Sequence, residues 1–400
     1  MVKKTSFYLL LFICFFTNIF GQAKKQNSNI VNATTFGVKP DYKNGIGTDN
    51  TKFLQDAIDF CSKNNLTLLL PKGKILLNSY GITSADKAHV NILQLKSNLT
   101  IKGNKSELVI GSFFHDKHFI VFSGFNSIDS SKFDTLQNIK IKNITIDFNS
   151  QNSYMVSGYK LRRGIELGHT KNVTISNCKF YNGDISCCIG SGFHSKNFSS
   201  NIEISNNIFL DLTQSSQNID HTSVYINSLN SKVHHNKFIN SSIQGKLVAC
   251  ATEFHNSDNQ FYKNTINGYT RMMFLASTKI ENKEISNLII RDNFAELTNA
   301  GIYLWVEENC KIKTILIKKN TFISEHVSGY GMIHNGTQGI LADARNDVNA
   351  KIEDMTITEN KTIIKKTVIG GRAVQFATEY TFKDTNNTCE GCNDGLFYKK

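Results

Sequence analysis

Acidic, basic and histidine residues recur at similar positions along the middle of the chain, and their types suit acid–base chemistry. Carboxylates and imidazoles move protons, while arginine and lysine stabilise developing negative charge. The candidate catalytic residues are Glu166, Asp184, Asp220, His221, Lys246 and Arg271. Glu253 and His255 form a further Glu-x-His pair. Each of these residues also has a structural interpretation, as a turn residue or a solvated surface charge.

A repeat of short strands must position these side chains. Residues 172–192, NVTISNCKFYNGDISCCIGSG, contain three alternating apolar and polar runs joined by tight turns. The pattern recurs, and its corner residues, 27–40 positions apart, are Asn143, Cys178, Asn207, Asn236, Asn264, Asn293, Asn320 and Asn360. A strand-based period of this length predicts an all-β solenoid. The corner asparagines are expected to form structural ladders that bond turn amides.

The third strand of each coil is the predicted location of the site. Side chains alternate across a strand, so inward Ile165, Cys187 and Val224 would leave Glu166, Cys188 and Tyr225 outward in one column. A later coil places Ile302, Leu304 and Val306 inward by the same pattern. An outward Trp is not needed for the core and indicates a stacking platform for sugars. The candidate binding residues are Arg163, Tyr225, Tyr303, Trp305 and Glu307.

Composition narrows the partners. The net charge is +12, which favours an acidic partner such as a polyanionic glycan, a membrane surface or nucleic acid. No compact Lys/Arg block or nucleic-acid motif is present, so nucleic acid is not predicted. Cys389 and Cys392 (TCEGC) predict a small disulfide loop, since no second CxxC or nearby histidine completes a zinc site. The predicted packing cysteines are Cys178, Cys187, Cys188, Cys250 and Cys310.

The amino-terminal region predicts export. Residues 1–23 begin with Lys3 and Lys4, continue with an apolar run and end in small residues, as a secretory signal peptide does. A non-cleaved anchor is the alternative. We expect a linker at 24–32, one β-helix domain at 33–385 that includes an amino-terminal cap, and a tail at 386–400. The predicted location is the periplasm or the extracellular space, without membrane insertion.

A short helix is expected to cap the first coil. Phe53, Leu54, Ala57, Ile58 and Cys61 recur at helical spacing on one face, and a strand at 66–70 follows. An open solenoid end needs such a cap, because exposed strand edges invite aggregation.

This amino-terminal region resembles a known superfamily. Phe36-Gly37-Val38, then GTDNT, a helix and LLLPKGKILL are similar to the start of pectate-lyase-superfamily β-helices. That group includes polygalacturonase-like hydrolases related to glycoside hydrolase family 28, pectate lyases and some phage tailspikes. Together with the repeats, the resemblance covers about residues 33–380. It implies a right-handed parallel β-helix with a carbohydrate groove on its first sheet.

A second resemblance concerns the site. NGDISCCIGSG resembles the GDDCIAIGSG signature of polygalacturonases, which makes Asp184 the expected general acid. His221 falls within about a residue of the histidine in the family's Gly-His-Gly motif, and Arg271 matches the arginine of its Arg-Ile-Lys motif.

The chain departs from that family at three places. Ile185 stands at the second aspartate, Leu161-Arg162-Arg163 stands where the family has Asn-Thr-Asp, and Met273 replaces the lysine. Glu166 or Asp220 would have to replace the lost base for hydrolysis.

The sequence therefore predicts an exported enzyme that cleaves an acidic polysaccharide, uronic-acid-containing or sulfated. Hydrolysis would centre on Asp184, whereas β-elimination would use His221 with the cations Arg163, Lys246 and Arg271 to neutralise a uronate. No cofactor is predicted. For Ca²⁺, which many such lyases use, the nearby candidate ligands are Glu166, Asp184 and Asp220. The alternatives are a non-catalytic glycan-binding protein and a structural or adhesive surface protein, and the oligomeric state is open.

Overall fold

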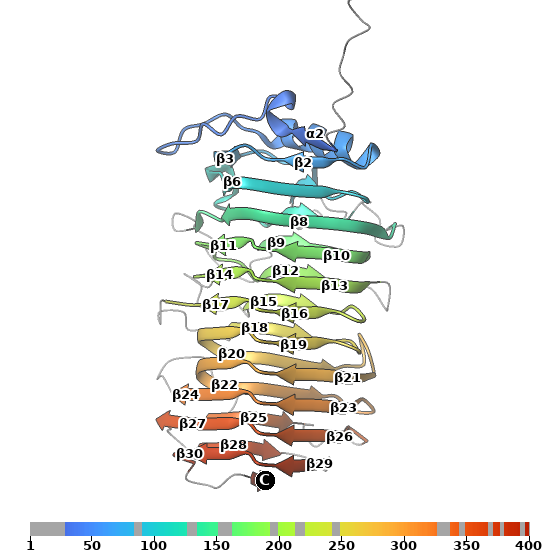
Figure 1. The fold of residues 1–400 in the computed structure, drawn as a ribbon, viewed down its shortest axis with the longest axis vertical. Helices are drawn as coiled ribbons and strands as arrows, with labels where there is room; N and C mark the ends of the chain where they lie inside the picture. The colour runs from blue at the N-terminus through green and yellow to red at the C-terminus, as the bar shows by residue number, and fades with distance from the viewer. Residues whose placement is uncertain are drawn as a thin grey trace, which may run out of the picture.

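Short strands with alternating apolar and polar residues pair with their counterparts one coil later and build a long column of coils (Figure 1). The computed structural model describes residues 29–83, 90–125, 134–150, 162–192, 199–212, 221–241, 249–325, 337–343, 349–366, 371–376, 380–392 and 397–399. A coil contributes up to three strands, which stack into three faces, A, B and C. The predicted parallel β-helix is confirmed.

Face A is a continuous parallel stack. Its strands are β1 (Ile30–Asn32), β2 (Thr67–Leu69), β10 (Thr170–Ser176), β13 (Ser200–Ser205), β16 (Lys232–His234), β19 (Gln260–Tyr262), β21 (Glu284–Arg291), β23 (Lys311–Lys318), β26 (Lys351–Thr358) and β29 (Tyr380–Thr385). Two long strands, β6 (Thr100–Ile110) and β8 (Leu136–Asp147), run through both face A and face B.

Face B contains β3 (Gly73–Leu77), β11 (Lys179–Tyr181), β14 (Ile208–Leu210), β17 (Lys237–Ile239), β24 (Thr321–Glu325), β27 (Lys361–Lys366) and β30 (Thr388–Glu390). The long strands β20 (Thr265–Ser277) and β22 (Phe294–Val306) pass from face B to face C.

Face C, which carries the candidate site, also contains β5 (Val90–Gln94), β7 (Phe119–Ser123), β9 (Arg162–Glu166), β12 (Cys187–Ser191), β15 (His221–Ile226), β18 (Ala249–Phe254), β25 (Thr337–Asp343), β28 (Gly371–Phe376) and β31 (Phe397–Lys399). The short strand β4 (Ile82–Thr83) pairs antiparallel with β5.

The helix α2 (Thr51–Lys63) covers the amino-terminal end of the column, as predicted (Figure 1). Leu54, Ala57, Ile58 and Cys61 are fully buried and belong to the core cluster. Phe53 is 37% exposed, so its predicted place on the buried face is wrong. Two 3-10 turns, η1 (Ala33–Phe36) and η2 (Ser112–Phe114), flank the first coils.

A buried asparagine ladder runs along the corner between faces A and B. Each side-chain oxygen accepts from the backbone N–H and the side-chain amide of the preceding asparagine, while each amide also donates to a strand carbonyl. The rungs are Asn207, Asn236, Asn264, Asn293, Asn320, Asn360 and Asn387. Cys178 donates its backbone N–H to the first rung. The predicted ladders are therefore confirmed at this corner.

The residue before each rung adopts a left-handed conformation, which turns the chain sharply. Asn206, His235 and Lys263 have φ of 57°, 55° and 54°. A second, exposed ladder links left-handed asparagines on face A, as in the bond from Asn230 to Asn201 at 2.7 Å. Asparagine tolerates this conformation better than most residues, which explains its abundance at the turns.

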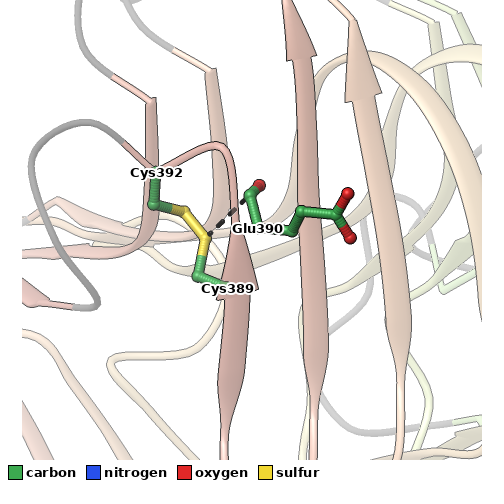
Figure 2. Close-up of a disulfide and its surroundings, with 3 residues drawn as sticks. All are labelled: Cys389, Glu390 and Cys392. Carbon is green, nitrogen blue, oxygen red and sulfur yellow. Dashed lines mark hydrogen bonds between the residues drawn. A yellow bond between two sulfur atoms is a disulfide. The ribbon is translucent and has the colours of Figure 1, made fainter.

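The strands extend past both predicted domain limits. β1 lies within the predicted linker at 24–32, while β30 and β31 lie within the predicted tail at 386–400. A disulfide joins Cys389 to Cys392, whose Cα atoms are 5.9 Å apart (Figure 2). The predicted packing cysteines are all buried. Across the described ranges, no helix combines the length and apolar character needed to cross a membrane. The predicted signal peptide lies outside the described residues.

Candidate functional site

The outer surface of face C carries a column of functional side chains, one from each successive strand. Residues in register along the column are Glu166, Gly190, Tyr225, Glu253, Phe274 and Tyr303. The flanking residues Ile302 and Leu304 belong to the core cluster, so the column faces outward by alternation. Strand spacing places neighbouring members of the column about 4.8 Å apart.

The predicted register of β12 was wrong by two residues. Ile189, not Cys187, pairs with Ile165 and Val224, so Gly190 and not Cys188 lies between Glu166 and Tyr225. Cys188 and Ile189 both belong to the core cluster. Two consecutive inward residues therefore interrupt the two-residue period where the chain enters face C. Met272 and Met273 repeat this feature three coils later.

Arg163 and Glu166 form a buried ion pair on the outer side of β9. The Arg163 Nη1 donates to Glu166 Oε2 at 2.8 Å, and the two side chains are 8% and 0% exposed. Glu166 Oε1 also accepts from the backbone N–H of Gly168. Burial raises the pKa of Glu166, and the Arg163 charge opposes that rise only in part. Glu166 is thus a carboxyl held in place by Arg163 and Gly168 on the outer side of the coil.

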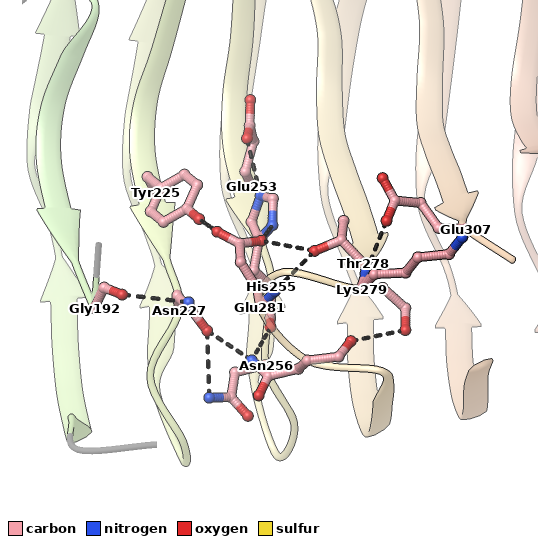
Figure 3. Close-up of polar contacts among 12 residues, drawn as sticks. Gly192, Tyr225, Asn227, Glu253, His255, Asn256, Thr278, Lys279, Glu281 and Glu307 are labelled. Atoms are coloured by element: carbon pink, nitrogen blue, oxygen red, sulfur yellow. Dashed lines mark hydrogen bonds and ion pairs between the residues drawn. The ribbon is translucent and has the colours of Figure 1, made fainter. Parts of the chain in front are cut away.

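A second array lies further along the column, where His255 bridges two carboxylates (Figure 3). The His255 Nε2 donates to Glu253 Oε2 at 3.0 Å, and Nδ1 donates to Glu281 Oε2 at 2.5 Å. Because both partners are carboxylates, both ring nitrogens carry protons. Burial alone would lower the pKa of His255, but these two hydrogen bonds outweigh it and raise the pKa to about 9. The side chain is therefore an imidazolium at neutral pH.

Tyr225 completes this array. Its ring stacks on the His255 imidazole with centroids 4.4 Å apart, and its hydroxyl donates to Glu281 Oε1. Thr222, on the same strand, donates its hydroxyl to Glu253 Oε1. Tyr225 is only 6% exposed. Tyr225 thus lies on the outward column, as predicted, with its ring against His255 and its hydroxyl on Glu281.

An aromatic group continues the surface from the array towards the carboxyl-terminal coils. The Arg271 guanidinium lies 4.7 Å from the centre of the Tyr303 ring and 5.9 Å from that of Phe274. Trp305 packs edge-on against Phe274 at 5.8 Å and remains partly exposed. Tyr303 is fully buried by these neighbours. Of the two rings predicted to stack on sugars, Tyr303 and Trp305, only Trp305 is thus reached by solvent.

Asp184 does not join the outer cluster. It is 2% exposed, and its carboxylate lies 3.8 Å from the guanidinium of the buried Arg162. Arg162 in turn donates to the carbonyl oxygens of His115 and Lys117. The resemblance predicts that Asp184 is the general acid; in the structure its carboxylate lies beside Arg162 before the start of β12 and is not a member of the outward column.

His221 also faces the interior. Its Nδ1 donates to the carbonyl of Ile185 at 2.7 Å, and its Nε2 accepts from the hydroxyl of Ser223, which contacts the Tyr269 hydroxyl. The residue is 1% exposed. Burial lowers the pKa of His221 to about 4, so the ring is neutral. His221 therefore bonds groups inside the β-helix and does not reach the outer surface, where the candidate site lies.

Three predicted residues remain to be placed. Asp220 and Lys246 lie outside the described residues. Glu307 follows β22, and its carboxylate accepts from the backbone N–H of Lys279 at 2.8 Å (Figure 3). The structure therefore brings Glu166, Arg163, Tyr225, Arg271, Tyr303 and Trp305 onto one surface and leaves Asp184 and His221 beneath it.

The central acid of the observed site, Glu253, came from a weak sequence signal, and Glu281 was missed. Glu253 and His255 are two residues apart at the end of a strand, a spacing that places both side chains on one face. Glu281 stands in a polar segment after β20, where no strand period predicts a direction. Among the described residues, no group of three or more His, Cys, Asp or Glu side chains has the arrangement of a metal site.

The column of coils is shared with phage tailspike proteins. The tailspike of E. coli bacteriophage HK620 in complex with a pentasaccharide aligns with a TM-score of 0.78 and 24% identity over 93% of this chain. A mutant of the same tailspike in complex with a hexasaccharide aligns with a TM-score of 0.78 and 23% identity, also over 93% of this chain. The chain spans 63% of the tailspike chain in both cases.

The likeness shows the fold. At this identity it carries no activity from the tailspike to this chain. No protein-family model matches the chain, and no curated protein matches it. The polygalacturonase-like and pectate-lyase-like resemblance therefore stays a prediction, while the parallel β-helix similar to the HK620 tailspike is established.

Proposed function

We propose that the protein is an exported enzyme that cleaves an acidic polysaccharide along the outer surface of face C. The observation that carries this proposal is the concentration of buried ionisable side chains on an outward column. Arg163 pairs with Glu166 on β9, and Glu253 pairs with His255 three strands further along the column, next to the strand that carries Arg271. Water-exposed faces of a β-helix do not need buried charges for stability, since such charges cost desolvation energy. Function is the usual reason to retain them.

The two strand carboxyls suit acid–base cleavage. We assign Glu166, whose pKa burial raises, as the candidate proton donor, and Glu253, which accepts hydrogen bonds from Thr222 and His255, as the candidate proton acceptor. Glu166 and Glu253 lie three strand spacings apart along the column, roughly 14 Å, so an inverting pair at ~6.5–9.5 Å would require the two side chains to reach towards each other over the substrate. We place hydrolysis before elimination because the column offers two carboxyls, one for each proton transfer.

Digestion of a panel of uronic-acid and sulfated polysaccharides tests the proposal, with reducing ends and ultraviolet absorbance measured together. Reducing ends without absorbance support hydrolysis through Glu166 and Glu253. If absorbance rises together with reducing ends, the reaction is β-elimination and not hydrolysis, because elimination leaves an unsaturated sugar that absorbs ultraviolet light.

A non-catalytic glycan-binding role is the second candidate, and one observation favours it. The charges of the site satisfy one another, since Arg163 is paired with Glu166 and His255 is paired with two carboxylates. A folded protein that binds a polysaccharide of the panel but releases no product would establish this role instead.

A further inference from the structure

Two donors on face C hold a carboxylate between them. The Tyr225 hydroxyl, from β15, donates to one oxygen of Glu281, and the His255 imidazolium, directly after β18, donates to the other (Figure 3). One neutral and one cationic donor, each directed at a different oxygen, form a site for a single carboxylate group. Tyr225 and His255 are each 6% exposed, so both donors are shielded while Glu281, 24% exposed, occupies the site.

The carboxylate that fills this site does not come from the column. Glu281 belongs to the segment 278–283, here called the strap, which connects β20 to β21. The strap lies between two strands and joins a neighbouring strand only at its last residue, where the Lys283 carbonyl accepts from the Lys311 N–H; its tip residue Ile280 is 82% exposed. Its base is closed by bonds from Ser277 Oγ and Thr278 N to the Asn282 carbonyl. Glu281 thus reaches the site from a connection between strands, whereas its two donors stand on β15 and directly after β18.

The remaining hold of the strap on face C is modest. The Asn282 amide donates to Asn227 Oδ1 at 2.8 Å and to the His255 carbonyl at 2.6 Å. At its other side, Lys279 pairs with Glu308 on the surface and donates its backbone N–H to the Glu307 carboxylate. Glu281 therefore supplies the charged contact between the strap and the site, and another carboxylate could replace it without unfolding a coil.

We propose that Tyr225 and His255 form the recognition site for the carboxylate of an acidic sugar, and that Glu281 occupies this site until the sugar displaces it. The inference rests on the proposed function and adds the substrate class, a uronate-containing chain. Exchange of Glu281 for a uronate conserves charge, because His255 keeps two carboxylate partners. A neutral sugar would leave the imidazolium with Glu253 alone, and it would lose the charge-assisted bond.

Displacement has a measurable consequence for affinity. When a residue of the same chain fills a site, an external ligand can bind only those molecules in which the site is open. The apparent affinity is then the intrinsic affinity multiplied by the open fraction. Removal of the Glu281 charge should therefore increase affinity for uronates and leave affinity for neutral sugars unchanged. Glu308 offers a matched control, because it pairs with the strap through Lys279 but does not contact His255.

Calorimetry with trigalacturonate and its methyl ester, and with the corresponding glucuronate pair, tests the proposal. Glu281→Gln should bind the free acid about tenfold more tightly than the wild type does, while Glu308→Gln should match the wild type. The methyl ester should bind equally weakly to all three proteins. Equal affinities for acid and ester, no gain in Glu281→Gln, or no binding of either uronate to any variant would each overturn the proposal.

A second variant separates recognition from simple loosening of the strap. Tyr225→Phe keeps the ring that stacks on His255 but removes the hydroxyl donor. In the Glu281→Gln background it should cancel most of the gain in uronate affinity, whereas loosening alone would preserve the gain.

These experiments test the recognition site and the enzymatic activity separately, so that one proposal can fail while the other holds. Uronate binding that depends on Glu281, in a protein that cleaves nothing, would refute the enzyme and retain the recognition site. Cleavage of a polysaccharide, in a protein whose uronate affinity does not depend on Glu281, would retain the enzyme and refute the recognition site.

Discussion

The hydroxyl of Tyr225 donates to Glu281, a residue 56 positions further along the chain. Two coils separate the strand of Tyr225 from the strand that precedes Glu281, since β15 pairs with β18 and β18 pairs with β20. Most contacts in a solenoid join adjacent coils. This contact instead ties three coils together at the site, and His255 lies at its centre (Figure 3).

The contribution of Glu281 to stability should depend on pH. The pKa of His255 is raised to about 9, so the stabilisation from its charged form is fully present below its ordinary value of 6.5 and is lost as the pH rises through about 9. Burial opposes ionisation of Glu281, but its bond from His255 lowers the pKa, so its contribution is present above 4.5 and is lost in stronger acid.

Denaturant unfolding of the wild type and Glu281→Gln checks this dependence. The wild type should be more stable by on the order of 2 kcal/mol between about pH 5 and 6.5, and the difference should shrink towards zero above pH 9. The other charged groups near this contact are Glu253, Glu166 and Lys279. A constant difference across the whole range would mean that the imidazolium does not contribute.

His221 should matter for folding and not for chemistry. Replacement by leucine removes the side-chain donor to the Ile185 carbonyl and one of the two partners of the Ser223 hydroxyl, which costs about 3 kcal/mol. Because the pKa of His221 is lowered to about 4, the wild type should also lose stability as the pH falls from 6.5 towards 4, and His221→Leu should lack this component. The free energy of unfolding of the wild type and of His221→Leu, each measured at pH 7 and pH 4.5, checks this difference in pH dependence.

Glu253→Gln should abolish most cleavage while substrate still binds. Loss of a positioned proton acceptor typically lowers turnover by about 10²–10⁴-fold. Initial rates on the polysaccharide identified by the panel provide the measurement, and Glu203→Gln, which changes an exposed residue of face A, serves as the control. Unchanged turnover in Glu253→Gln would remove Glu253 from the mechanism.

Trp305→Ala should weaken polysaccharide binding roughly tenfold, because large aromatic rings dominate the energetics of such surfaces. Phe294→Ala is the matched control, since Phe294 lies on the same strand, is 42% exposed and faces away on face B. Titration by affinity electrophoresis compares the two. A similar loss in both variants would indicate a general change in the strand and not a platform.

Asn264→Ala should be strongly destabilising. Asn264 accepts from Asn236 and donates to Asn293 and to the Val233 carbonyl, and the residue is 1% exposed. Loss of these buried bonds should lower the free energy of unfolding by about 3 kcal/mol. Asn267→Ala, an exposed change three residues later, should cost less than about 1 kcal/mol.

The fold could be predicted because its signals are local and repeated. The corner asparagines mark each coil, and each must be Asn because its amide serves a neighbouring amide and a carbonyl at the same time. Helix α2 was also recognisable from Leu54, Ala57 and Ile58 at helical spacing. Phe53 was misplaced because an apolar residue on a short helix does not have to be buried.

The site was harder to predict because its geometry depends on two departures from the pattern. Alternation breaks at Cys188 and Ile189, which both enter the core, so counting back from Ile189 assigned the wrong face. The resemblance around Asp184 directed attention to a carboxylate that the fold uses in an ion pair with Arg162. Glu281 reaches the site from a connection between strands, where side-chain direction follows from tertiary packing alone.

The strap also limits how this solenoid can change its length. Whole coils could be gained or lost near β23–β27 with the asparagine ladder simply rejoined, since Asn320 and Asn360 present equivalent rungs. A coil inserted between β15 and β20 would move Glu281 away from Tyr225 by one rung of the column, about 4.8 Å. The three coils that the strap spans are thus inherited as a block, within a chain whose other coils are interchangeable modules.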